Sequence, residues 1–392
     1  MTTEQRFFIC VLADHLQGRE TAVPDEALDW DALLSLGRSH QLSAILYAQC
    51  QNFLPEKYEE TLSREHATAL FYNANREAVV ARLMETLEEE EIPHFIVKGA
   101  AVAAYYPVKA LRTMGDTDLV IHTEDRLRAH AIMQAQGFEN KSRFEDREWV
   151  YYKDQMEFEL HDHLVYSETI TRSDHESFFN DFWQYYRDGE LDWSFHLLFL
   201  LLHLRKHLMN EGVGFRQFMD VAVVTKNCAA LDWTWIAAKL GELSMMDFAR
   251  TVFALNAAWF GVETPIPGKV LDESFLEEAT ALVSRNGVFG FDNAENRDNA
   301  AVNAVRGQEN SRQAMSRLAI RKVFPPYEAL IVVPHYSFLR GRRWLLPAAW
   351  VYRFFYGVRE KKVSRAVRMV RGSYVSDETI QKRSAMLDQW GL

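Results

Sequence analysis

The segment 95–121, FIVKGAAVAAYYPVKALRTMGDTDLVI, constrains the fold more than any other part of the chain. It begins with a short apolar run that favours a β-strand and that Gly99 interrupts. Small residues then predict a short helix over 100–106, which a proline ends. After a turn, Asp116 and Asp118 open a second apolar run. The segment therefore predicts a strand, a helix and a second strand.

The two aspartates stand at the head of the second strand, where aspartate is uncommon. Side chains two residues apart in a strand point to the same face of the sheet, so the carboxylates of Asp116 and Asp118 are expected to lie side by side. Each negative charge raises the pKa of the other carboxyl group unless a cation lies nearby. A divalent ion held by carboxylates and substrate phosphates is a common solution. Alone, however, Asp-Thr-Asp is also an ordinary turn or strand-start sequence.

A third carboxylate is expected on a predicted β-hairpin over 147–161, with its turn at 153–155. The second arm of the hairpin alternates apolar and polar residues, as a half-buried strand does. Its polar positions include Glu157 and Glu159. By this pattern alone, either glutamate could face the aspartate pair.

The order strand, glycine with a small residue, helix, turn, Asp-x-Asp, strand resembles the DNA polymerase β-like nucleotidyltransferase superfamily. The longer pattern Lys-Gly-Ala, Tyr-Pro and Leu-Arg-Thr-Met-Gly-Asp-Thr-Asp-Leu-Val is similar to a little-characterised bacterial branch, the nucleotidyltransferase family proteins. The resemblance implies that Asp116, Asp118 and a third carboxylate bind two Mg²⁺ ions, which Mn²⁺ could replace, and a nucleoside triphosphate. Glu159, followed by Leu-His, resembles the family's acidic-apolar-His pattern, so we favour Glu159 as the third carboxylate, with Glu157 in reserve.

The resemblance also implies residues that hold the triphosphate. They are expected to be Lys98, Gly99, Ala100 and Arg112. Most members of the superfamily have Gly-Ser or Gly-Gly in this first element, and Ala100 lacks the hydroxyl that would contact a phosphate. Lys98 could substitute for that hydroxyl as a point charge.

A further phosphate contact is expected in the helical run 191–261. Gly-Phe-Arg216, followed by Asp220, resembles a second pattern typical of the family. It implies that Arg216 contacts a phosphate and that Asp220 orients Arg216. The preceding apolar helix carries three histidines near one face: His196, His203 and His207. We favour the interpretation that they are satisfied polar groups at a helix interface, and the alternative is contact with nucleotide or acceptor.

Composition limits the class of protein. The 392 residues include 48% hydrophobic ones, enough to bury a sizeable core in two or three structural units. Three widely spaced cysteines fit a reducing compartment and not a disulfide framework. The N-terminal sequence lacks the basic start of a signal peptide, and the most apolar run, 195–204, is too short to span a bilayer. We therefore expect a cytoplasmic protein.

Charge is distributed unevenly along the chain, whose net charge is −11. The segment 312–371 has 14 basic residues against two acidic ones, which leaves 30 basic against 53 acidic residues elsewhere. Within it, 340–358 is apolar with a basic rim, the profile of an interfacial helix, so contact with a membrane surface is one interpretation. We favour packing of these aromatic residues on the helical region. No sequence-specific nucleic-acid binding is expected, because no groove-reading motif is present.

The chain is therefore expected to be an α+β protein. A small mixed β-sheet nucleotidyltransferase core at 91–190 would lie between an N-terminal helical region at 1–90 and a C-terminal helical region at 191–392, which includes the basic tail segment 312–371. The expected function is Mg²⁺-dependent transfer of a nucleoside monophosphate from an NTP to the hydroxyl of a small molecule, sugar, protein or RNA end, with release of pyrophosphate. The alternative is a non-catalytic nucleotide-binding or scaffold protein at the membrane periphery.

Overall fold

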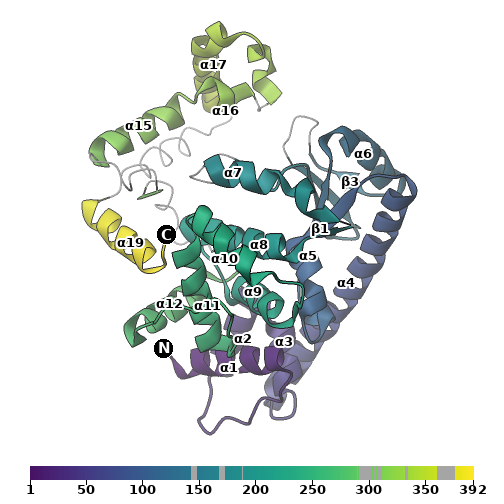
Figure 1. Ribbon diagram of the computed structural model, residues 1–392, viewed down its shortest axis with the longest axis vertical. Helices are drawn as coiled ribbons and strands as arrows, with labels where there is room; N and C mark the ends of the chain where they lie inside the picture. The colour runs from purple at the N-terminus through teal and green to yellow at the C-terminus, as the bar shows by residue number, and fades with distance from the viewer. Residues whose placement is uncertain are drawn as a thin grey trace.

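The computed structural model describes residues 1–142, 148–166, 173–187, 189–288, 290, 302–303, 306, 311–331, 334–359 and 376–392. Part of the predicted basic tail segment, from 360 to 371, lies outside these described residues. The chain folds into many helices around one five-stranded mixed sheet (Figure 1). The predicted α+β class, a small mixed sheet flanked by helices, is confirmed.

The sheet has the strand order β1-β2-β5-β4-β3. Its strands are β1 (His94–Val97), β2 (Asp116–Ile121), β3 (Glu139–Asn140), β4 (Trp149–Lys153) and β5 (Met156–His161). The central pair, β2 and β5, is parallel, and all other neighbours are antiparallel. The predicted hairpin is formed by β4 and β5, whose two-residue turn has φ values of 48° at Asp154 and 65° at Gln155. Two positive φ values in a row are typical of the turn that matches strand twist.

One face of the sheet is covered by the long helix α4 (Glu56–Glu89) and by α6 (Arg126–Ala135). The apolar residues of the strands that point this way form a core with both helices: Leu83, Leu87, Leu119, Ile121, Met133, Phe158 and Leu160 are among its members. In Figure 1, α4 runs along one side of the molecule, beside the sheet. The alternation of apolar and polar residues in β2 and β5 leaves their acidic side chains on the opposite face.

Helices that precede and follow the sheet in the chain, together with the short helix between β1 and β2, form a larger core on that opposite side of the sheet. They are α1 (Thr3–Gln17), α2 (Trp30–Ser39), α3 (Ser43–Cys50), α5 (Lys98–Val102), α8 (Trp193–Asn210), α9 (Phe215–Asn227), α10 (Trp233–Glu242), α11 (Met246–Phe260) and α12 (Glu273–Asn286). Ring contacts join Phe8 of α1 to Phe215 of α9, and Phe215 to Trp259 of α11. The first three helices and the helices after the sheet thus share one hydrophobic core.

The remaining elements are short or lie near the C-terminus. They are α7 (Ser173–Asn180), the paired β6 (Tyr186–Arg187) and β7 (Glu190–Leu191), α15 (Ser311–Val323), α16 (Tyr327–Ile331), α17 (Leu346–Arg359) and α19 (Asp377–Gln389). Trp390, just after α19, is buried against Phe218 and Phe275. In contrast, α16 and α17 project at one end of the molecule (Figure 1). Among the described residues, no helix combines the length and apolar character needed to cross a bilayer.

Candidate active site

The acidic residues of β2 and β5 are brought together by the register of the parallel strand pair. Asp116 is opposite Glu157, and Asp118 is opposite Glu159. Neighbouring residues in this register share a face of the sheet, so all four carboxylates lie on the side of α8 and α9. The fold therefore places both candidates for the third carboxylate beside the aspartate pair.

Asp118 is the buried member of this group, at 2% exposure. Its Oδ1 lies 2.5 Å from Nζ of Lys98 and 3.0 Å from Nε2 of His161. Burial by itself would raise the pKa of the Asp118 carboxyl, but the charges of Lys98 and His161 outweigh that effect and lower the pKa well below its ordinary value. Asp118 is therefore a carboxylate with two cationic neighbours.

His161 binds two of the acidic residues at once. Its Nε2 is 3.0 Å from Oδ1 of Asp118 and 3.2 Å from Oε2 of Glu159. Burial opposes protonation of the ring, but these two carboxylates outweigh it and raise the pKa of His161 to about 9. Ligand atoms of Asp118, Glu159 and His161 lie within 4.8 Å of one another, close enough to hold one metal ion.

Asp116 is the exposed member of the group. Its pKa is raised because its surroundings are poorly solvated and because Asp118 and Glu159 are negative, although Lys98 opposes the shift. Carboxylate oxygens are the ligands that Mg²⁺ prefers. A further cation beside Asp116 would relieve this repulsion, so the donor set of Asp116, Asp118 and Glu159 fits a divalent ion.

Lys98 adopts an unusual backbone conformation, with a φ of 56°. This left-handed conformation costs a lysine roughly 1–3 kcal/mol and persists only where contacts impose it. Here the backbone N–H of Lys98 donates to Nε2 of His196 at 3.0 Å, while its Nζ binds Asp118. His196 is thus a satisfied group at a helix interface, as the sequence suggested. The charges of Asp118 and Asp116 outweigh burial and raise the pKa of Lys98.

Gly99 allows the Arg112 guanidinium to lie directly against the backbone. A Cβ at position 99 would lie 2.7 Å from Nη2 of Arg112. The guanidinium continues to α9, where Nε and Nη2 donate to the Asp220 carboxylate at 2.9 and 2.6 Å. Tyr106 donates to the same carboxylate at 2.8 Å. The expectation that Asp220 orients Arg216 is therefore wrong, because the fold gives Asp220 a bidentate partner in Arg112.

Arg216 is a buried cation, at 7% exposure, and it forms no ion pair with any carboxylate in the described part of the chain. Its Nη1 donates to Oε1 of Gln41 and, at 3.1 Å, to the carbonyl of Thr113. Its Nε has no hydrogen-bond partner among the described residues. Burial and the charge of Arg112 lower the pKa of Arg216 to about 9. Such a group favours an anionic ligand.

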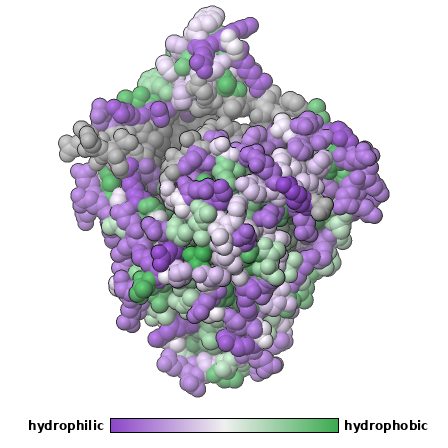
Figure 2. All heavy atoms as spheres, in the orientation of Figure 1, coloured by the Kyte–Doolittle hydropathy of each residue, from purple (hydrophilic) through white to green (hydrophobic). Residues whose placement is uncertain are grey.

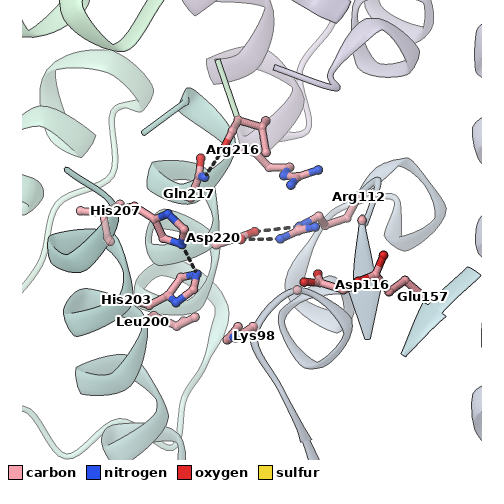
Figure 3. Close-up of a pocket in the computed structure, with 14 residues that line it drawn as sticks. Lys98, Arg112, Asp116, Glu157, Leu200, His203, His207, Arg216, Gln217 and Asp220 are labelled. Carbon is pink, nitrogen blue, oxygen red and sulfur yellow. Dashed lines mark hydrogen bonds and ion pairs between the residues drawn. The ribbon is translucent and has the colours of Figure 1, made fainter. Parts of the chain in front are cut away.

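A cavity of about 340 Å³ separates the acidic face of the sheet from α8 and α9 (Figure 3). The residues that line it include Lys98, Gly99, Arg112, Asp116 and Glu157 on one side and Leu200, His203, Leu204, His207, Arg216, Gln217 and Asp220 on the other. Most of the predicted site residues thus share one cavity. Three do not line it: Asp118 and Glu159, which cluster with His161, and Ala100, which lies in α5.

A chain of hydrogen-bonding groups reaches the cavity from α8. The Nδ1 atom of His207 lies 2.8 Å from Oε2 of Glu211, and its Nε2 lies 3.0 Å from Nε2 of His203. Burial and the proximity of His207 hold the pKa of His203 well below its ordinary value. His203 is therefore neutral near pH 7. It contacts His207, which in turn contacts Glu211.

Two residues of α4, which sequence reasoning did not single out, support the loop before β2. Arg76 donates to the carbonyl of Asp116 at 3.0 Å and to that of Met114 at 3.4 Å. Asn73 donates to the carbonyl of Ala110 at 2.6 Å. Both side chains are buried although α4 is otherwise rich in solvent-exposed charges. The sequence carries no local signal that distinguishes them from the other polar residues of this helix.

Comparison with known proteins agrees with the geometry of the site. A family model described as uncharacterised nucleotidyltransferase matches residues 26–261, which include the whole sheet, the cavity-lining parts of α8 and α9, and more than half of the chain. No curated protein and no solved structure matches the chain. The chain belongs to this family of uncharacterised nucleotidyltransferases.

Proposed function

We propose that this protein is a Mg²⁺-dependent enzyme that moves a nucleoside monophosphate from an NTP to an acceptor hydroxyl. The acceptor oxygen forms a new bond to the α-phosphorus, the bond between that phosphorus and the bridging oxygen to the β-phosphate breaks, and pyrophosphate leaves. The observation that supports this most strongly is the β2–β5 register, which pairs Asp116 with Glu157 and Asp118 with Glu159 beside a cavity with cationic walls.

Asp116, Asp118 and Glu159 are the residues that would hold the metal, with Glu157 as the reserve for the third position. When bound, two Mg²⁺ ions would neutralise charge on the attacking and leaving oxygens. His161 would orient Asp118 and Glu159, since it contacts both carboxylates. Asp116 lines the cavity, and Asp118 and Glu159 lie beside it on the same face of the sheet, which supports this division of roles.

The phosphates of the nucleotide are assigned to Lys98, Gly99, Ala100, Arg112 and Arg216. Lys98 and Arg216 would supply positive charge where charge develops during the reaction. Arg112 already forms an ion pair with Asp220. Its main role in this proposal is therefore to form the part of the cavity wall beside Gly99. Since Ala100 has no hydroxyl, only the backbone of α5 can contribute there.

The acceptor is placed on the α8 side of the cavity, near His203. A neutral imidazole can take the proton that the acceptor hydroxyl loses as it attacks. The contact of His203 with His207, which in turn binds Glu211, would fix the orientation and the tautomer of the His203 ring. Leu200, His203, Leu204 and His207 line the cavity on this side, and the acceptor hydroxyl of a small molecule, sugar, protein or RNA end would approach the nucleotide there.

The decisive experiment is calorimetric titration of each NTP, with and without Mg²⁺, into wild type and Asp116→Asn/Asp118→Asn. We expect Mg²⁺-dependent binding of at least one NTP, and we expect the double variant to lose it, because the metal ligands are gone. The single variant Asp116→Asn should show most of this loss while keeping the fold, since its side chain is exposed.

Asp154→Asn is a matched control, because Asp154 lies in the β4–β5 turn with a φ of 48° that asparagine tolerates. It should bind NTP as the wild type does. If folded wild-type protein binds no NTP in the presence of Mg²⁺ or Mn²⁺, the enzyme proposal is wrong and the scaffold function takes its place.

A further inference from the structure

Outside the matched family region, the chain forms a small C-terminal subdomain from α16, α17 and the turns between them, residues 324–331 and 334–359. It has its own core, in which Leu330, Tyr336, Leu339 and Ala349 are buried. Trp350 packs against this core and donates to the carbonyl of Pro325 at 2.9 Å. The sequence favoured packing of these aromatic residues on the helical region, but Trp350 packs instead against the subdomain's own core.

The opposite side of α17 is apolar and exposed. Its residues, with Trp344 from the turn before the helix, follow the spacing of one helical face: Trp344, Pro347, Ala348, Val351, Phe354 and Phe355. Trp344 is 76% exposed, Phe354 66% and Phe355 64%. Contiguous apolar surface of this kind on a folded protein marks an interaction site. We call these six residues the apolar face.

Basic residues border the apolar face. Arg340, Arg342 and Arg343 are exposed just before α17. Arg353 is half-buried and follows the buried Ala349 by four residues, so it lies on the side of α17 that faces the subdomain's core. The only acidic residue of the described C-terminal subdomain is Glu328, on α16. Figure 2 shows hydrophobic and hydrophilic residues side by side on the projection formed by this subdomain. The surface thus combines aromatic groups with excess positive charge, while the remainder of the chain is acidic.

We propose that the apolar face of α17 docks on an anionic lipid bilayer surface, with its aromatic side chains at the level of the headgroups and its arginines against the lipid phosphates. Helices that lie in a membrane interface combine these two features. A second copy of the chain is a poorer occupant, because it would bring two arginine-rich rims together. A groove of an acidic protein is also less favoured, since the apolar face offers no polar side chain to fix the register of a specific complex.

The test is co-sedimentation of the full-length protein with vesicles of phosphatidylcholine alone or mixed with phosphatidylglycerol. We expect binding to the mixed vesicles that weakens as salt increases, because charge attraction is screened. Trp344→Ser/Phe354→Ser/Phe355→Ser should reduce the partition coefficient about a hundredfold, since the buried apolar area is lost. Arg340→Gln/Arg342→Gln/Arg343→Gln should remove the preference for phosphatidylglycerol.

Phe71→Ser/Val270→Ser is the matched control, because these side chains are 70% and 93% exposed elsewhere on the molecule. It should bind vesicles as the wild type does. The proposal is overturned if wild-type protein does not sediment with anionic vesicles at low salt, or if the triple serine variant binds equally well. It is also overturned if light scattering finds a wild-type dimer that the serine variant converts to monomers, since the apolar face would then bind a second copy. None of these outcomes depends on NTP binding.

Discussion

Lys98 and Gly99, at the junction between β1 and α5, show how single residues shape the cavity. Lys98 is held in a left-handed conformation by bonds at both its backbone and its side chain. Gly99 is needed for a different reason: any side chain at this position would collide with the Arg112 guanidinium. Lys98 therefore neutralises part of the charge of the acidic group, and Gly99 leaves the space that Arg112 needs to reach Asp220 of α9.

Replacing Gly99 with alanine should destabilise the protein. The new Cβ would lie 2.7 Å from Nη2 of Arg112, so the guanidinium must move away from Asp220. We expect a loss of about 1–3 kcal/mol in the free energy of unfolding, as for other overpacked sites. Denaturant titration measures it. Gly241→Ala is the control: its Cβ would meet nothing within 4 Å, and it should gain about 0.5–1 kcal/mol of helix stability. Equal effects of the two substitutions would contradict the close approach of Arg112.

The stability of the metal-free protein should depend on pH through His161. Its pKa is about 9 in the folded protein and ordinarily 6.5, so the ring contributes stability that is fully present below pH 6.5 and is lost as pH rises to 9. The shift corresponds to roughly 3 kcal/mol. With a chelator present, the free energy of unfolding of the wild type should therefore fall more steeply over this range than that of His161→Gln. Parallel curves for the two proteins would show that His161 does not titrate in this way.

At the scale of the element, α4 has two functions along its length. Its C-terminal half packs Leu83 and Leu87 under the sheet, whereas its middle sends Asn73 and Arg76 into the loop that leads to β2. These two polar side chains hold carbonyl groups of the loop, so α4 positions the aspartates without lining the cavity.

Arg76→Met should therefore weaken NTP binding although Arg76 does not line the cavity. The methionine fills similar space but leaves the carbonyls of Met114 and Asp116 without their donor, so the aspartates lose their fixed position. We expect a reduction in affinity of roughly tenfold and a loss of about 1–3 kcal/mol in stability. Calorimetry with Mg²⁺ and an NTP measures the first. Arg82→Met, at an exposed position of the same helix, should leave both unchanged. If Arg76→Met binds the NTP with wild-type affinity, Arg76 does not position the aspartates for nucleotide binding.

For the whole molecule, the important contact is the buried ion pair between Arg112 of the loop before β2 and Asp220 of α9. It crosses the cavity wall and joins the sheet to the helical core, with Tyr106 as a second donor to Asp220. A charge left without its partner in such a place is costly, whereas removal of both charges is tolerated better.

A double-mutant cycle on this pair should be strongly non-additive. Arg112→Met and Asp220→Leu should each destabilise the protein by about 3–5 kcal/mol, because each leaves one buried charge unpaired. The double variant should lose less than the sum of the two, by an amount that denaturant unfolding can measure. The surface pair Lys57–Asp31 is the control, with both side chains 71% exposed; its cycle should give less than about 1 kcal/mol. Additive effects at Arg112 and Asp220 would contradict a direct buried pair.

The sequence by itself determined the elements and the composition of the site. An apolar run was enough to predict β2, and alternation of apolar and polar residues predicted the second arm of the β4–β5 hairpin, because burial on one face requires it. The Asp-x-Asp spacing was enough to put two carboxylates together. Only the tertiary structure decided which residues from distant segments meet. Three such contacts are the parallel pairing of β2 with β5, the choice of Arg112 over Arg216 as the partner of Asp220, and the support of the loop by Arg76. Each joins residues more than thirty positions apart in the chain. Local patterns cannot encode such contacts, because they arise from the shape of the shared core and not from the order of neighbouring residues.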